Sequence, residues 1–245
     1  MKIGNLSVSL VFSLLFFTSC KEKTAEGTAP EAQVAIPADL GGYWVNDAWW
    51  QVLQSTKSPM KAAEKVNQFA AAIFHQDSSK WLADLSFGWH EGQQYTLHTK
   101  DGGLQLYDPK NAAVQAIPFV PQPDGSIRLD STPMVRLGDA FTGFNVIAHS
   151  IVGGNYDWKG KQVVFNPNGT VVGLEDYYRY ELLLDYVVDE IGADQLMLSK
   201  QGQSPEFYAF KIEGNKLRVF SLDDIGGQDA FQYQVGKVKY ELVKK

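Results

Sequence analysis

The chain has a single cysteine, Cys20, among its 245 residues. It therefore contains no internal disulfide, and a folded domain has to be stabilised by its core alone. Blocks of basic residues are also absent: 22 Lys and Arg stand against 28 Asp and Glu, which gives a net charge of −6. A surface of that sign is a poor match for nucleic acid and for anionic lipid headgroups. We expect neither as a partner.

The sequence also lacks the common catalytic motifs. Gly-x-Ser-x-Gly, His-Glu-x-x-His and a phosphate-binding glycine loop do not occur. Acidic residues are adjacent at three places: Glu175-Asp176, Asp189-Glu190 and Asp223-Asp224. Neighbours on a strand point to opposite faces, whereas a glycosidase needs two carboxylates that face each other across a cleft. We therefore assign no catalytic residue and no cofactor. A hydrolase and a weak calcium site at Asp223-Asp224 are kept as alternatives.

His90 and His98 are the histidines that one hairpin could bring together. With a turn at Gly92-Gln93, His90 would face Tyr95 and His98 would face Phe87, so the two imidazoles would lie on opposite faces of the sheet. We expect no metal site there. Of the other two histidines, His75 is expected to end a helix and His149 to be structural.

The first twenty residues have the pattern of an exported protein. Lys2 supplies a positive charge, an apolar stretch runs from Leu6 to Phe17, and Thr18-Ser19-Cys20 follows before the composition turns polar. A charged start, a short apolar core and small residues before a cleavage site are typical of a secretory signal. The stretch has about 12 residues, whereas a membrane-spanning helix needs roughly 20.

Phe17-Thr18-Ser19-Cys20 resembles the lipobox of bacterial lipoproteins, with Phe17 in the place where Leu is usual. The resemblance implies that residues 1–19 are removed and that Cys20 carries acyl chains such as palmitate, which anchor the protein to a membrane. Lys21 follows the cysteine, where an Asp is the usual signal for retention in the inner membrane of Gram-negative cells. By this analogy we expect the protein in the cell envelope, at the outer membrane, on either its periplasmic or its surface face.

Residues 20–37 are rich in Lys, Glu, Ala, Thr and Pro and have little to bury. They predict a flexible tether, which spans roughly 20–25 Å on average. The remaining residues, 38–245, fit the size of a single β domain, and we expect one domain.

Alternation of apolar and polar residues dominates after Trp81. It is found in the runs Gln94–Thr99, Ile127–Asp130, Tyr208–Ile212 and Val238–Leu242, and Leu217–Leu222 is also expected to be a strand. Such runs, separated by turn pairs such as Asp124-Gly125 and Asn168-Gly169, predict an antiparallel sheet with one buried face. We expect a mostly β fold, an antiparallel β-barrel with one or two flanking α-helices. Gly154–Trp158 could begin a second, smaller sheet.

Helical features are expected both before the alternating runs and between two of them. Asn46–Thr56 is expected to form a short helical turn, and another helical piece is expected between Asp139 and Ser150. The clearest helix is predicted to begin at Ser58, a good N-cap, with Pro59 at its first position. An apolar stripe at helical spacing continues to Ile73, so the helix is expected to reach that residue.

Gly42-Tyr43-Trp44 opens the first predicted strand. With this start the chain resembles the lipocalin or lipocalin-like group, in which Gly-x-Trp closes the barrel floor. Asp185-Tyr186 matches the Asp-Tyr pair of the second motif without its neighbouring Thr and later Tyr, and Arg218 matches the arginine of the third. The resemblance implies an up-and-down barrel with a cup-shaped interior, in which Arg218 packs over Trp44.

The resemblance further implies a non-enzymatic envelope lipoprotein that binds a small hydrophobic ligand inside the barrel. The residues expected to line the cavity are Trp44, Trp89, Tyr95, Tyr208 and Phe210, chosen because aromatic side chains bury a large area. One alternative is a carbohydrate-binding module that stacks sugar rings on Trp49, Trp50 and Trp81. A second is a scaffold with a filled core that holds other envelope proteins.

Overall fold

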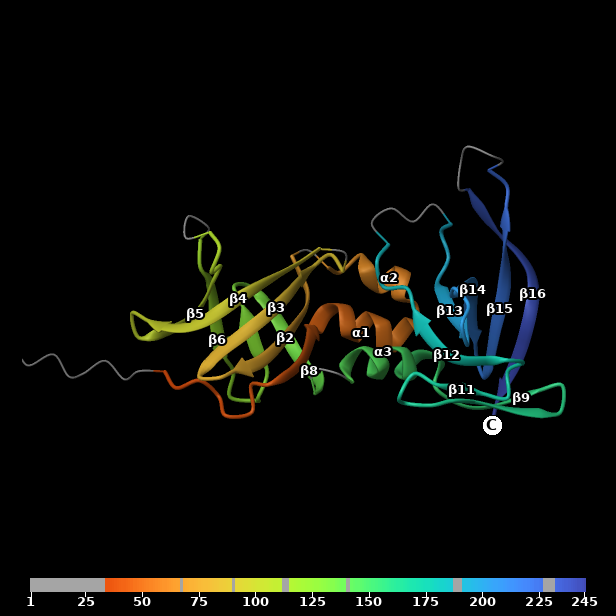
Figure 1. Ribbon diagram of the computed structural model, residues 1–245, viewed down its shortest axis with the longest axis horizontal. Coiled ribbons are helices and arrows are strands. Elements are labelled where there is room, and N and C mark those ends of the chain that lie inside the picture. Colours follow the sequence, from red (N-terminus) through yellow and green to blue (C-terminus); the bar gives the residue numbers. More distant parts are fainter. Residues whose placement is uncertain are drawn as a thin grey trace, which may run out of the picture. The chain divides into compact units, whose positions relative to one another are not determined.

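The computed structural model describes residues 34–66, 68–89, 91–111, 115–139, 142–186, 191–226 and 232–245. The predicted signal segment, Cys20, most of the tether, His90 and the pair Asp189-Glu190 lie outside these ranges. The described residues form three helices and sixteen strands, coloured along the chain in Figure 1.

The first eight strands form a closed antiparallel barrel in which each strand pairs with the next and β8 returns to β1. They are β1 Gly42–Asn46, β2 Phe69–Asp77, β3 Lys80–Phe87, β4 Glu91–Lys100, β5 Gly103–Tyr107, β6 Ile117–Pro121, β7 Ile127–Leu129 and β8 Thr132–Gly138. Alternate residues point inward, as in Ile127 and Leu129, which are buried on either side of the exposed Arg128. This alternation gives the barrel one apolar interior.

The last eight strands form a second antiparallel sheet in the order β11-β10-β9-β16-β15-β14-β13-β12. They are β9 Gly154–Trp158, β10 Lys161–Phe165, β11 Val171–Val172, β12 Tyr177–Leu182, β13 Gln195–Lys200, β14 Glu206–Glu213, β15 Lys216–Asp224 and β16 Tyr233–Lys244. A β-bridge joins Thr170 to Arg179, and Tyr180 N donates to Gly169 O at 2.9 Å. The sheet therefore curls until its two end strands, β11 and β12, meet.

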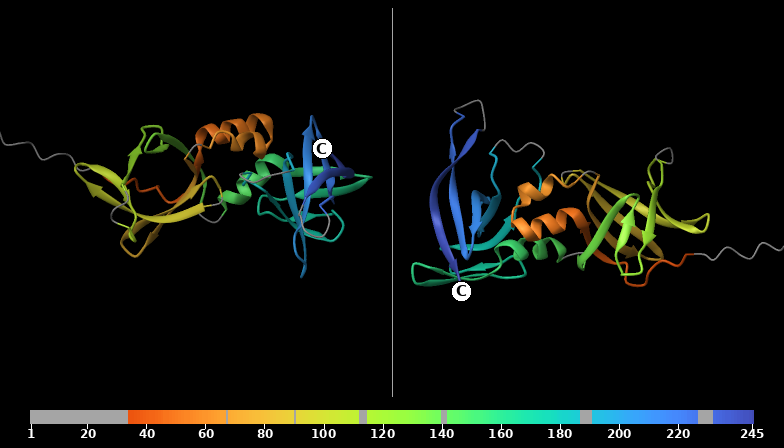
Figure 2. Two further views of the ribbon diagram at one scale, coloured as in Figure 1. Left: turned by 90° about the horizontal axis from the view of Figure 1, so that it is seen from above. Right: turned by 180° about the vertical axis from the view of Figure 1, so that it is seen from behind.

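Three helices lie between the barrel and the second sheet (Figures 1 and 2): α1 Asp47–Thr56, α2 Pro59–Ala63 and α3 Gly143–Val152. Trp49 and Leu53 of α1 and Ile147 of α3 are fully buried. They belong to one apolar core that also contains Tyr43 from the outside of the barrel and Tyr180 from the second sheet. The helices thus join the two β bodies through a shared core.

The prediction of a mostly β chain with an antiparallel barrel and flanking helices is confirmed. The expected helices at residues 46–56 and 139–150 correspond to α1 and α3. Gly154 does begin a second sheet, which has as many strands as the barrel. Asn46 explains why α1 starts where it does, because its Oδ1 accepts a hydrogen bond from Trp49 N at 3.1 Å.

The predicted helix from Ser58 to Ile73 is wrong over most of its length. Ser58 does cap the helix by accepting from Lys61 N at 3.2 Å, but α2 ends at Ala63 and β2 begins at Phe69. Most of β2 is buried on both faces, since Phe74 lies in the barrel interior while Ala71 contacts the helices. A strand buried on both faces reads as a continuous apolar run, which spacing alone does not distinguish from a helix.

The predicted hairpin turn at Gly92-Gln93 is also wrong. The chain turns at Gly88-Trp89, so Phe87 lies opposite Glu91. Trp89 and Gly88 both have positive φ, of 72° and 60°, which makes the tight connection. His75, expected at a helix end, lies on β2 instead, with its Nδ1 3.5 Å from Asp84 Oδ2.

Candidate functional site

Two of the predicted ligand-lining residues, Trp44 and Tyr95, lie in the barrel interior, which side chains fill. The rings of Trp44 and Phe74 meet edge to face at 6.4 Å, and those of Phe74 and Phe119 at 5.6 Å, so aromatic rings cross the interior. Trp44 Nε1 donates to Leu40 O at 2.9 Å. The residues of this interior group are almost fully buried: Leu40, Trp44, Phe74, Tyr95 and Phe119. An eight-stranded barrel is narrow enough to be filled in this way, so Trp44 and Tyr95 act as core.

The other three predicted lining residues lie elsewhere. Trp89 packs on Trp49 with ring centres 4.7 Å apart and borders two surface cavities of about 340 and 380 Å³. Tyr208 and Phe210 are buried on the second sheet, where Phe210 also borders a cavity of about 330 Å³. The structure therefore does not bring the five residues to one cavity.

The three tryptophans of the carbohydrate alternative do not form an exposed row. Trp49 lies on the buried face of α1 and is completely buried in the core. Trp50 is half-buried and stacks on Trp49 at 6.3 Å, while Trp81 is half-buried and packs against the residues that fill the barrel. Sugar binding of this kind needs ring faces that are open to solvent.

The arginine beside Trp44 is Arg136, not Arg218 as the family resemblance implied. Arg136 lies opposite Trp44 on β8, and its Nε and Nη2 donate to Gly41 O at 2.9 and 2.7 Å. Arg218 is on β15 of the second sheet, where it pairs with Glu213 and Glu241 at 2.7 and 2.9 Å. The expectation that Arg218 packs over Trp44 is corrected accordingly.

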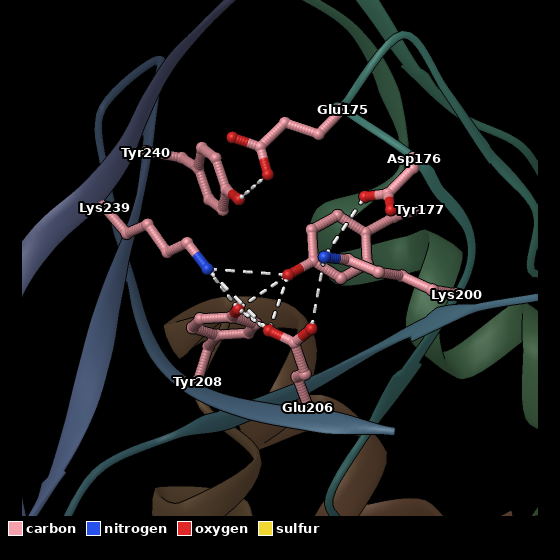
Figure 3. Close-up of polar contacts among 8 residues, drawn as sticks. All are labelled: Glu175, Asp176, Tyr177, Lys200, Glu206, Tyr208, Lys239 and Tyr240. Carbon is pink, nitrogen blue, oxygen red and sulfur yellow. Dashed lines mark hydrogen bonds and ion pairs between the residues drawn. The ribbon is translucent and has the colours of Figure 1, made fainter. Parts of the chain in front are cut away.

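A group of polar side chains on the second sheet, which we name the tyrosine–lysine cluster, is drawn in Figure 3. Its members are Glu175, Asp176, Tyr177, Lys200, Glu206, Tyr208, Lys239 and Tyr240. They come from four strands and from the turn before β12, so distant parts of the sequence converge here. The three tyrosines are buried, whereas Glu206 and Lys239 keep 39% and 37% of their side chains exposed. The cluster therefore lies where the inner face of the sheet meets solvent.

Glu206 is the acceptor at the centre of the tyrosine–lysine cluster. The hydroxyl groups of Tyr177 and Tyr208 both donate to Glu206 Oε2, the first at 2.7 Å. The two phenolic oxygens are themselves 2.7 Å apart. Lys200 Nζ lies 3.3 Å from Glu206 Oε1, and Lys239 Nζ lies 3.8 Å from Oε2. Both oxygens of the carboxylate therefore have donors from the chain itself.

A β-bulge places Lys239 in the cluster. Val219 pairs with Tyr240 while Phe220 pairs with Val238, so Lys239 is an extra residue on β16. Bulges redirect side chains, and this one turns the lysine toward the tyrosines. Its Nζ donates to Tyr208 OH and lies 4.6 Å from the centre of the Tyr208 ring and 5.4 Å from that of Tyr240. These distances are typical of cation–π contacts.

The protonation states in the cluster are set by burial and hydrogen bonding. The hydrogen bond from Tyr208, followed by that from Tyr177, lowers the pKa of Glu206 to about 2. Burial raises the pKa of Tyr177, Tyr208 and Tyr240 well above the usual value near 10, and Tyr240 also donates to Glu175 Oε2 at 2.8 Å. The arrangement suits a hydrogen-bonded link between β12, β13, β14 and β16.

Sequence reasoning identified Tyr208 but missed its partners. Simple alternation along β16 assigned Val238 and Tyr240 to the same face and Lys239 to the opposite one. The bulge reverses this, because Val238 is 49% exposed while Tyr240 is buried. The Glu-x-Tyr spacing of Glu206 and Tyr208 was the available signal, since residues two apart on a strand share a face.

The opposite face of β14–β16 carries an apolar surface open to solvent. We name it the outer apolar face, and it consists of Phe207, Phe220, Leu222, Tyr233, Val235 and Val238. Phe207, Val235 and Val238 are 46%, 43% and 49% exposed. Phe220 lies beside Val238 and Leu222 beside Val235, so the surface is continuous across β15 and β16. Contiguous exposed apolar surface marks a contact site more often than single exposed residues do.

No group of three metal-ligating side chains occurs in the described part of the chain. Asp223 and Asp224, considered for calcium, accept from Ser221 Oγ and Gly226 N at 2.9 Å each. His98 packs on the ring of Tyr107, and burial lowers the pKa of His149. Among the helices of the described ranges, none has the length and apolar character to cross a membrane.

Comparison of the chain with protein-family models, with curated proteins and with solved structures gives no match in any of the three.

Proposed function

We propose that the protein is a non-catalytic lipoprotein of the cell envelope, anchored through Cys20, which serves as a scaffold that holds another protein. The outer apolar face is the observation that carries this proposal. Phe207 on β14 and Val235 and Val238 on β16 are each more than two-fifths exposed, on either side of β15. Exposing apolar area to water is unfavourable at roughly 25 cal/mol per Å², so a surface of this kind gains stability when a partner covers it.

The filled barrel supports the scaffold over a small-ligand carrier. Trp44, Phe74 and Phe119 occupy the space that a cup-shaped interior would leave for a ligand. The tyrosine–lysine cluster supports a non-catalytic role in the same way, because its carboxylate is engaged by Tyr177, Tyr208 and Lys200. Both β bodies thus have interiors suited to stability, and the exterior is left for recognition.

Membrane attachment rests on the leader sequence. Cys20 follows an apolar stretch of export type, and the polar residues after it provide a tether. Acyl chains on Cys20 would hold the domain near the membrane while leaving the outer apolar face accessible. The expected site is the outer membrane.

Attachment is tested with Cys20→Ser. The variant is expected to leave the membrane fraction and to lose incorporation of radiolabelled palmitate, whereas Ser19→Ala keeps both. A Cys20→Ser protein that still sediments with membranes would contradict the anchor.

The scaffold is tested by photo-crosslinking in intact cells of its own host. A photoreactive amino acid replaces Val238 in the outer apolar face or, as the control, Val172, an exposed valine on β11. A discrete crosslinked protein is expected from position 238 and none from position 172. Mass spectrometry of the purified native protein tests the alternative. A non-covalently bound lipid or pigment in a stoichiometric amount would contradict the scaffold and identify a small-ligand carrier.

A further inference from the structure

Two cavities adjoin along the outer apolar face. One, of about 330 Å³, is lined by Phe220 and Val235 together with Met60 and Lys61 of α2. The other, of about 380 Å³, is lined by Phe207, Leu222 and Tyr233. Val235 lies two residues from Tyr233, and Phe220 two residues from Leu222, so the cavities follow each other on one face of the sheet. We name the pair the outer groove.

The α2 end of the outer groove is basic, although the chain as a whole is acidic. Lys57, Lys61 and Lys211 line it, with Asp194 as the one lining carboxylate, and Lys211 Nζ pairs with Glu213 Oε1 at 2.7 Å. Asp194 Oδ1 already accepts hydrogen bonds from Ser58 Oγ at 2.9 Å and Met60 N at 2.8 Å. Lys61 is exposed and has no ion pair within the ranges that the structure describes. Charge complementarity therefore favours a negatively charged group at this end.

We infer that the outer groove binds an extended segment of the partner protein that carries apolar residues and, at the α2 end, acidic residues. The inference rests on the proposed scaffold function and names the kind of partner. Side chains two apart on an extended peptide project to the same side about 6.6 Å from each other. Two such apolar side chains fit the two cavities. A carboxylate next to them in the peptide lies on the solvent side, where it can meet the exposed Lys61 at the edge of the outer groove.

A peptide suits the outer groove better than an acyl chain does. An acyl chain is stabilised in proportion to the apolar area that it buries, and the open walls at Phe207 and Tyr233, which are 46% and 38% exposed, would leave part of it in water. A chain lying there keeps one side in water, and a peptide backbone tolerates water because its polar groups are then hydrogen-bonded. An alternating peptide places polar side chains on that wet side.

The test measures peptide binding by fluorescence anisotropy to the full mature chain in phosphatidylcholine nanodiscs. The probes are labelled peptides of four Glu-Val repeats, four Lys-Val repeats and four Glu-Ser repeats. The Glu-Val peptide is expected to bind about tenfold more tightly than either of the others, since it alone supplies both charge and apolar area. Equal affinities for the Glu-Val and Lys-Val peptides would overturn the inference.

Variants locate the binding. Lys61→Glu is expected to weaken Glu-Val binding about tenfold, whereas Lys65→Glu, an exposed lysine that does not line the outer groove, leaves it unchanged. Val235→Ser is expected to weaken it similarly, and Val172→Ser, at an exposed valine of β11, is the control. Equal losses in a variant and its control would contradict the location.

A competitor and a separate readout complete the design. Displacement of the peptide by an equal concentration of dodecanoate would assign the outer groove to a lipid carboxylate and would overturn the peptide inference. If no peptide binds while position 238 still crosslinks to a protein in cells, the inference about the outer groove fails and the scaffold function stands. If no peptide binds and position 238 also gives no crosslinked protein, the proposed scaffold function is contradicted as well.

Discussion

Lys239 Nζ lies 3.8 Å from Glu206 Oε2, and both groups contact the hydroxyl of Tyr208. The lysine is in this position because it is the extra residue of a β-bulge on β16. Without the bulge, Lys239 would point away from Tyr240, and the cation would be lost from the cluster. A local irregularity of one strand therefore completes a network that joins β12, β13, β14 and β16.

Replacing Lys239 by Met tests this contribution to stability. The variant keeps the length of the side chain but removes the ammonium from the Tyr208 ring and from Glu206. We expect the free energy of unfolding to fall by about 1 kcal/mol, a modest value because the lysine is partly exposed. Urea denaturation measures the change. Lys237→Met is the matched control, since Lys237 is exposed on the same strand and should change stability by less than about 0.5 kcal/mol.

The free energy of unfolding is expected to fall in acid because of Glu206. Hydrogen bonds from Tyr208 and Tyr177 lower its pKa to about 2, from a usual value of 4.5. A group whose pKa is lower in the folded state stabilises that state fully above the unfolded pKa and loses this contribution as the pH falls through the folded pKa. The contribution of Glu206 should therefore be complete above about pH 5 and decline between about pH 4.5 and 2. Urea unfolding as a function of pH measures it.

Glu206→Gln provides the comparison for the pH dependence. The amide cannot ionise, so the difference in stability between the native protein and this variant should shrink as the pH falls toward 2. Glu64→Gln is the control, because Glu64 is exposed and outside the tyrosine–lysine cluster. A difference between the native protein and Glu206→Gln that stays constant from pH 6 to 2 would show that Glu206 is not a charged acceptor.

The sequence was sufficient to predict the elements whose pattern is local. Asn46 and Ser58 were predicted to begin helices, Ser58 as an N-cap, and both side chains accept capping hydrogen bonds. Alternation predicted strands that correspond to β4, β7, β14 and β16. These features depend on neighbours within a few residues, which a single sequence contains.

Features that depend on tertiary packing were not predictable in the same way. Phe69–Ile73 looked helical because helices cover β2 on one side and the barrel interior covers it on the other. The position of Lys239 depends on a bulge, and that of Arg136 on the pairing of β8 with β1. Neither the bulge nor the pairing of β8 with β1 can be recognised from neighbouring residues in the sequence. Arg218 was therefore chosen only because it follows the other two motifs in the expected order.

Arg136 is expected to stabilise the closure of the barrel. Its Nε and Nη2 both donate to Gly41 O, and therefore link β8 to the residue before β1. Arg136→Ala should lower the free energy of unfolding by about 1 kcal/mol, because one charged donor pair is lost at an exposed position. Arg128→Ala, at an exposed arginine on β7, should have little effect. Equal losses in the two variants would argue against a specific role for Arg136.

Gly143 tests how closely α3 packs on the barrel. A Cβ atom at this position would lie 2.2 Å from Cβ and Cγ of Tyr43, whose buried ring belongs to the core shared by the two β bodies. Since Gly143 does not have a positive φ, the effect of Gly143→Ala is steric, and we expect a loss of about 2–3 kcal/mol as the helix is displaced from β1. Gly103→Ala is the control, because its Cβ would meet nothing closer than Lys100 O at 3.8 Å. Urea denaturation should show a large shift for the first variant and almost none for the second. A Gly143→Ala protein as stable as the native one would contradict the close packing of α3 on Tyr43.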